Sequence, residues 1–263
     1  MKRLFITLLI TLLPSAFLMA QQPDGKQLFL TLEGGAGLGY YRELGSSPIV
    51  YKGLELPPEI KVSINTPNWR YEAAISIRLG AYGYRIRIPS IHTFGLQATL
   101  GFQAMHLVHT APSLSIWAGA ALGNLFDIRV NPQLENSAVG ISDFTRLRLT
   151  LLGEYRLSRW CFFGQIWADP LALLYRPGYS YVSNYDRDIA SPVTATFDQY
   201  RLYPAALTGV ATQLGARLTL RSGNQLGLLY DWRYLTSRTS GAVAPWRFQQ
   251  ASHSLILQLL FQL

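Results

Sequence analysis

The chain lacks two features that are common in proteins outside the cytoplasm, paired cysteines and, after its first twenty residues, a long apolar run. Its 263 residues contain one cysteine, Cys161, so no disulfide can form within the chain. After the first twenty residues, no stretch is apolar for the roughly 20 residues that a membrane helix needs, although 49% of all residues are apolar and only 14% are charged. A disulfide scaffold and a helical membrane protein are therefore both excluded.

The first twenty residues have the layout of a secretory signal peptide. The basic pair Lys2-Arg3 precedes an apolar run over residues 4–13, and the segment closes on Ala20. Pro14-Ser15 interrupts the run too early for a membrane helix, so an uncleaved anchor is only the alternative. We therefore expect a signal peptide at 1–20 and one domain at 21–263, without a cysteine at the cleavage site for lipid attachment.

The charge balance is basic. The full chain has 23 Lys and Arg against 15 Asp and Glu, and loss of Lys2 and Arg3 leaves 21 − 15 = +6. On a secreted protein, such a charge is suited to the anionic head groups of lipid or lipopolysaccharide. We therefore expect outer-membrane lipid and lipopolysaccharide as partners, and no nucleic acid.

The apolar residues alternate with polar ones instead of running together. Between Phe94 and Val108 the even positions are largely apolar, whereas Gly, Gln and Thr occupy most odd ones, and the alternation recurs at 145–157, 226–234 and 254–263. These segments exceed the 5–6 residues usual in soluble sheets and match the roughly 10 residues of a tilted membrane strand. The pattern predicts an all-β fold, an antiparallel up-and-down transmembrane β-barrel.

The pattern gives about ten strands, with eight or twelve as alternatives. Short turns at 65–68, 109–112, 157–159 and 221–224 alternate with longer connections, as expected for periplasmic turns and external loops. The strand that starts at Pro58 is the weakest because prolines stand at its edge. The expected strands are 27–41, 58–65, 70–83, 92–108, 113–127, 144–157, 160–175, 202–221, 225–238 and 250–263. The longer connections are 42–57, 84–91, 128–143, 176–201 and 239–249.

Aromatic residues gather near the expected strand ends, where amphipathic rings favour the interface between hydrocarbon and head groups. We expect such a girdle to include Tyr40, Tyr41, Tyr71, Tyr155, Trp160, Tyr175, Trp232 and Tyr234.

The segment 251–261, with the whole alternating chain before it, resembles the small, uncharacterised outer-membrane β-barrels of Gram-negative bacteria. In that class the final strand carries the signal that the barrel-assembly machinery reads, and it usually ends on an aromatic residue. Here Phe261 lies two positions before the terminal Leu263, so the period matches and the last residue does not. The resemblance implies the cell outer membrane and the assembly machinery as a partner, and it implies no activity.

Charged residues on the inner face should form a paired network. A barrel of about ten strands is too narrow for a wide aqueous channel, and unpaired buried charges are costly. We therefore expect a side-chain-filled lumen and a structural or interaction role, with a narrow channel or porin for small solutes as the alternative. The expected network is Glu33, Glu72, Arg78, Arg146, Arg148, Glu154, Arg156, Asp169, Arg217, Asp231 and Arg233.

The longest connection, 176–201, mixes tyrosines with charges and is the first candidate for contact with a protein or glycan partner. A lid packed over the barrel mouth is the other interpretation. The candidate contacts are Tyr179, Tyr181, Tyr185, Asp186, Arg187 and Asp188.

The motifs do not predict an enzyme. Barrel proteases of the omptin type use paired acids and an Asp with a nearby His, whereas this chain has no Asp-x-His, and it also lacks the His-x-Ser spacing of barrel lipid hydrolases. His92, His106 and His109 do not have metal-ligand spacing, and His253 is expected to face lipid. We expect no catalytic, cofactor-binding or metal-binding residues and no cofactor, and a barrel enzyme acting on lipid or peptide is the second alternative.

Overall fold

The computed structural model describes residues 26–43, 47–83, 93–131, 139–177, 200–239 and 246–263. These residues form one antiparallel sheet, and no helix in them is long and apolar enough to cross a membrane. The strands are β1 (Gln27–Glu43), β2 (Ser47–Leu56), β3 (Glu59–Asn65), β4 (Trp69–Gly83), β5 (Thr93–Thr110), β6 (Leu114–Val130), β7 (Val139–Leu157), β8 (Trp160–Pro177), β9 (Tyr200–Thr219), β10 (Gln225–Thr239) and β11 (Trp246–Gln262).

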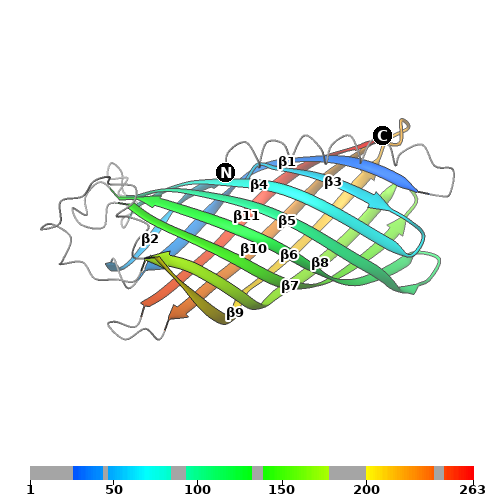
Figure 1. The fold of residues 1–263 in the computed structure, drawn as a ribbon. Coiled ribbons are helices and arrows are strands. Elements are labelled where there is room, and N and C mark those ends of the chain that lie inside the picture. The colour runs from blue at the N-terminus through cyan, green and yellow to red at the C-terminus, as the bar shows by residue number, and fades with distance from the viewer. Residues whose placement is uncertain (1–25, 44–46, 84–92, 132–138, 178–199, 240–245) are drawn as a thin grey trace, which may run out of the picture.

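The sheet closes on itself. Each strand from β4 to β11 pairs with the next, and β11 returns to pair with β1 from Phe29–Gln262 to Glu43–Phe248. The strands run obliquely around a common axis (Figure 1). Closure leaves no unpaired edge among the described strands, which is the condition for a sheet to cross a bilayer.

Strands β2 and β3 share one position in the wall. Both lie between β1 and β4, and Glu55 pairs with Gly37 while Glu59 pairs with Glu33, four residues further along each strand. The register is therefore continuous across Pro57-Pro58, where missing N–H groups only interrupt the ladder. The barrel has ten positions, which confirms the expected number. The expectation that 42–57 is an external loop was wrong, because the two prolines were interpreted as a strand end.

The expected alternation is confirmed along the wall. Leu147, Leu149 and Leu151 on β7 are 40–54% exposed on the outside, whereas Thr150 between them and Leu152 after them are buried. The same pattern holds on β11, where every second residue from His253 to Leu259 is exposed. The barrel thus carries an apolar outer belt and a largely polar inner face.

The two ends of the barrel differ. Short connections at 66–68, 111–113, 158–159 and 220–224 lie at one end, which we call the turn end, and the opposite end is called the loop end. Ser158 and Gly223 adopt positive φ angles of 55° and 87° in two of these turns. At the loop end, β6 to β11 all extend past the expected bounds. Apart from Asn131, the rest of the expected connections 84–91, 128–143, 176–201 and 239–249 lies outside the described residues.

Strand β8 changes phase at Pro170. The pairing with both neighbours shifts there, between Asp169 and Leu171 on the β9 side. Proline cannot donate to the ladder, so it is accommodated at such a bulge. Before the bulge the odd residues face inward, and after it Ala172 and Leu174 do so.

Candidate functional site: the charged lumen

The middle of the lumen is occupied by an ion-pair network around Arg78 on β4. Its guanidinium contacts Glu55 on β2 at 2.6 Å and Asp231 on β10 at 3.3 Å, and both acids are 0% exposed. Asp231 also accepts hydrogen bonds from Arg233 at 2.7 Å and from Gln213 at 3.0 Å. The network therefore joins strands from both sides of the barrel.

A second cluster lies at the β8 bulge. The carboxylate of Asp169 accepts hydrogen bonds from Arg146 at 2.9 Å and from Arg148 at 2.8 Å. The bulge at Pro170 places this carboxylate beside Gly209, where a Cβ would lie 2.6 Å from Oδ2 of Asp169. A side chain at position 209 would therefore displace the acid that holds the two arginines.

At the turn end, one part of the wall has three bases around one acid, and another part has three acids around one base. Glu154 on β7 accepts two hydrogen bonds from Arg70 at 3.0 Å each, and Arg217 and Arg156 lie 3.5 and 3.8 Å from its oxygens. On the β1–β3–β4 side, one cation, Lys61, faces three carboxylates. These are Glu33 at 2.7 Å, Glu59 at 3.0 Å and Glu72 at 3.9 Å.

At the loop end, Arg129 on β6 connects polar and aromatic groups. It donates to Asp127 at 2.9 Å and to Gln250 at 3.1 Å, and its guanidinium lies 4.1 Å from the ring centre of Tyr41 and 4.8 Å from that of Phe248. Charge-assisted hydrogen bonds and cation–π contacts of this kind stabilise the charge of a buried arginine.

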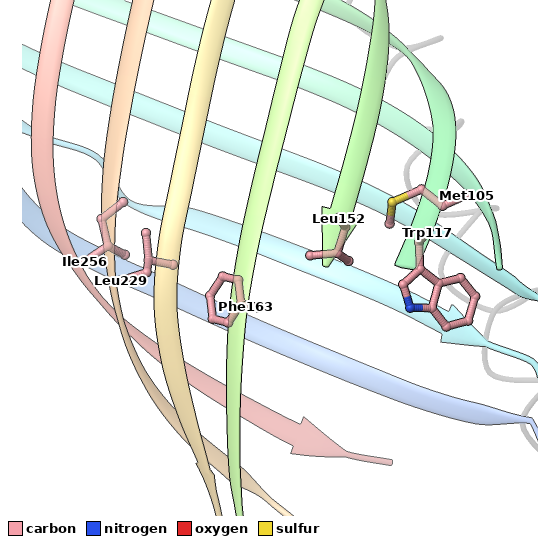
Figure 2. Close-up of a cluster of buried hydrophobic side chains, with 6 residues drawn as sticks. All are labelled: Met105, Trp117, Leu152, Phe163, Leu229 and Ile256. Carbon is pink, nitrogen blue, oxygen red and sulfur yellow. The ribbon is translucent and has the colours of Figure 1, made fainter. Parts of the chain in front are cut away.

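Apolar clusters lie between the charged groups. The cluster nearer the turn end comprises Met105, Trp117, Leu152, Phe163, Leu229 and Ile256, and Figure 2 shows these side chains inside the wall on strands from β5 round to β11. At Gly215 on β9 a Cβ would lie 2.7 Å from both Phe163 and Leu229, so this glycine makes room for the packing. The loop-end cluster comprises Leu125, Phe144, Leu174, Leu235 and Phe248, all 0–7% exposed.

The space left in the lumen is divided into cavities. A cavity of about 430 Å³ at the turn end shares Lys61, Glu72, Gln165 and Gln213 with one of about 90 Å³. That cavity in turn shares Trp167 and three arginines with one of about 50 Å³ beside Leu125 and Leu235. The cavities therefore decrease in size from the turn end towards the loop-end cluster.

All eleven charged residues proposed for the lumen lie on the inner face or at its rim, each in an ion pair within 4.0 Å. Arg156 is the most peripheral, with 66% of its side chain exposed. Sequence reasoning missed Glu55, Glu59, Lys61, Arg70, Asp127 and Arg129, all of which pair with members of the network or with each other. The phase of β4, in which Glu72 and Arg78 face inward, would have identified Arg70. Glu55 was missed because the prolines were interpreted as a strand end, and Arg129 was missed because the expected strand ended at residue 127.

The other candidate residues lie elsewhere. The loop residues 179–188 are outside the described part of the chain, as are His92 and the predicted signal peptide. His106, His109 and His253 are exposed on the outside, and His253 contacts the hydroxyl of Tyr230 there. Among the described residues, no group of three or more His, Cys, Asp or Glu is arranged to hold a metal ion.

Most of the expected girdle residues face outward, including Tyr71, Tyr155, Trp160 and Tyr175, which are 36–47% exposed. Tyr41 was assigned wrongly. It is 5% exposed and stacks inside the barrel on Tyr51, with ring centres 4.9 Å apart. Since neighbours on a strand face opposite sides, Tyr40 and Tyr41 could not both belong to the girdle.

No protein-family model matches the chain, and no curated protein does so either. Among solved structures, the outer membrane protease OmpT from Escherichia coli matches 92% of this chain and 98% of its own, with 7% identity and a TM-score of 0.51. The chain has the fold of an outer-membrane β-barrel. The translocator domain of the autotransporter NalP from Neisseria meningitidis matches 94% of this chain and 92% of its own, with 9% identity and a TM-score of 0.48. Neisserial surface protein A matches 89% and 98%, with 11% identity and a TM-score of 0.39. At these identities the likeness concerns the fold alone.

Proposed function

We propose that the protein is exported by its signal peptide and resides in the outer membrane of a Gram-negative bacterium. The outer belt of leucines and the outward tyrosines and tryptophans support this location, because they match the hydrocarbon and its two interfaces. In this orientation the turn end faces the periplasm and the loop end faces outward. Outer-membrane lipid, lipopolysaccharide and the barrel-assembly machinery are the corresponding partners.

We further propose that the lumen is closed and that the protein has a structural or interaction role through its external connections, chiefly 176–201. The observation that carries this proposal is the burial of the loop-end cluster, where Phe144, Leu174 and Phe248 are 0–2% exposed although they point into the lumen. Side chains in an open aqueous pore would be wetted. A wall fixed by buried ion pairs is suited to presenting external loops rigidly.

A narrow channel for small solutes is the second candidate. It is supported by the three cavities that share lining residues and decrease from about 430 to about 50 Å³. Rearrangement of the loop-end cluster and of Arg129 would be needed to extend this series towards the outside. The two candidates therefore differ in one measurable property, the conductance of the resting barrel.

Single-channel recording in planar bilayers tests the proposal. We expect no steady ohmic conductance from the chain that starts at Gln21, since the apolar cluster and Arg129 fill the loop end. The double variant Phe144→Ala, Phe248→Ala removes both aromatic rings of the loop-end cluster and should produce a small, steady conductance. A steady conductance in the unchanged protein would overturn the closed lumen and favour the channel.

A further inference from the structure

The turn-end cavity is the largest of the three cavities described above. Its volume is about 430 Å³, and it is lined by inward-facing residues of β1, β3, β4 and β7–β11, among them Glu154, Arg156, Cys161 and Arg217. We call it the turn-end vestibule. It opens where the short turns lie and is bounded on its inner side by Met105 and Leu152 of the apolar cluster.

One wall of the vestibule has more positive charge than its acid neutralises. Glu154, with 2% of its side chain exposed, already accepts both hydrogen bonds of Arg70. Arg217 and Arg156 reach it only at 3.5 and 3.8 Å, so three cations share one carboxylate. The Nε of Arg70 is buried and has no hydrogen-bond partner in the structure. This wall therefore has an excess of two positive charges.

The opposite wall has the reverse imbalance, because its three acids, Glu33, Glu59 and Glu72, face one cation, Lys61. Glu33 and Glu59 lie within 3.0 Å of Lys61, and Gln258 donates to Glu33 at 2.7 Å. Glu72 lies 3.9 Å from Lys61 and has 24% of its side chain exposed. The vestibule therefore has a positive and a negative wall, and an anion from the aqueous phase would bind at the positive one, where Arg156 has 66% of its side chain exposed.

We propose that the vestibule binds a small, doubly charged oxyanion of the phosphate type between Arg156 and Arg217. These two residues stand at the same level on either side of Cys161, which pairs in register with Arg156 on β7 and with Arg217 on β9. Guanidinium groups bind oxyanions through paired N–H donors, and two unneutralised positive charges favour a dianion over chloride. This site does not depend on whether the lumen conducts.

Cys161 provides a native reporter, because it is the only cysteine and lines the vestibule. The test compares its modification by anionic sulfonatoethyl and cationic trimethylammonioethyl methanethiosulfonate in detergent. Each rate is divided by that of a free thiol, which removes the difference in intrinsic reactivity between the two reagents. The thiolate fraction of Cys161 cancels when the two corrected rates are compared. We expect the anionic reagent to be favoured by roughly tenfold at low ionic strength. Millimolar phosphate should slow both reactions, and sodium chloride of equal ionic strength should do so much less.

The double variant Arg156→Gln, Arg217→Gln should bring the rate ratio close to one and abolish protection by phosphate. Arg221→Gln is the matched control, since Arg221 is exposed at the same end and does not line the vestibule. Its ratio and protection should equal those of the unchanged protein. A shift of the unboiled band on a denaturing gel verifies that each variant is folded.

Two results would overturn the site: equal corrected rates for the two reagents, or protection by phosphate no greater than by chloride. If Cys161 reacts with neither reagent, calorimetric titration with phosphate decides instead. In that case binding heat that is lost in the double variant supports the site, and its absence in the unchanged protein refutes it.

Discussion

Replacing Asp231 with asparagine is expected to lower the free energy of unfolding by about 3–5 kcal/mol, the usual loss when one partner of a buried ion pair is removed. Asp231 is 0% exposed and lies 2.7 Å from Arg233 and 3.3 Å from Arg78, so the variant leaves positive charge in the middle of the lumen. Urea unfolding in detergent micelles, followed by tryptophan fluorescence, measures the change.

Two further variants show whether the loss comes from unpaired charge. Asp231→Asn combined with Arg233→Gln removes both partners, and Arg78 keeps Glu55 at 2.6 Å, so most of the stability should return. Glu72→Gln removes a partly exposed acid 3.9 Å from Lys61 and should cost less than about 1 kcal/mol. Equal losses in Asp231→Asn and in the double variant would show that the shape of the site, and not its charge, is decisive.

The second large effect is expected at the seam where the barrel closes. Gly35 on β1 faces inward opposite Ile256, and a Cβ there would overlap the backbone carbonyl oxygen of Leu255 on β11. Because backbone atoms cannot move aside as a side chain can, Gly35→Ala should destabilise the barrel by at least about 3 kcal/mol, the upper part of the range for overpacking. The fraction of heat-modifiable protein after refolding and its urea midpoint are the measurements.

The neighbouring residue supplies the control. Gly34 faces outward, and a Cβ there meets no atom within 4 Å. Gly34→Ala should therefore leave the barrel unchanged or stabilise it by about 0.4–1 kcal/mol through the unfolded chain. If both variants fold equally well, the strands at this seam are further apart than the structure shows.

Much of the architecture could be predicted because the period of a strand is strictly two. Each residue of β7 or β11 faces either lipid or lumen, and the choice is visible in the sequence as apolar or polar. The same rule, applied consistently, would have placed Tyr41 inside and Arg70 in the lumen. Those two errors came from grouping residues by type without following their phase.

Other features could not be derived in this way. Pro57-Pro58 ended the expected strand, since a proline cannot donate to a ladder, yet pairing with β1 and β4 keeps β2 and β3 in one line. Register is a property of three strands together. The sequence of one segment with two prolines does not show that pairing with both neighbouring strands keeps its two halves in register.

The sequence by itself determined the class of fold, the approximate strand number and the side of the wall on which most residues lie, because these follow from local periodicity. Only the tertiary structure decided which charges meet. Arg70 and Glu154 are 84 residues apart in the chain and Arg78 and Asp231 are 153 apart. Their contacts depend on barrel closure and on the register of every intervening strand, so the division of the lumen into neutral, acidic and basic regions is a property of the closed barrel alone.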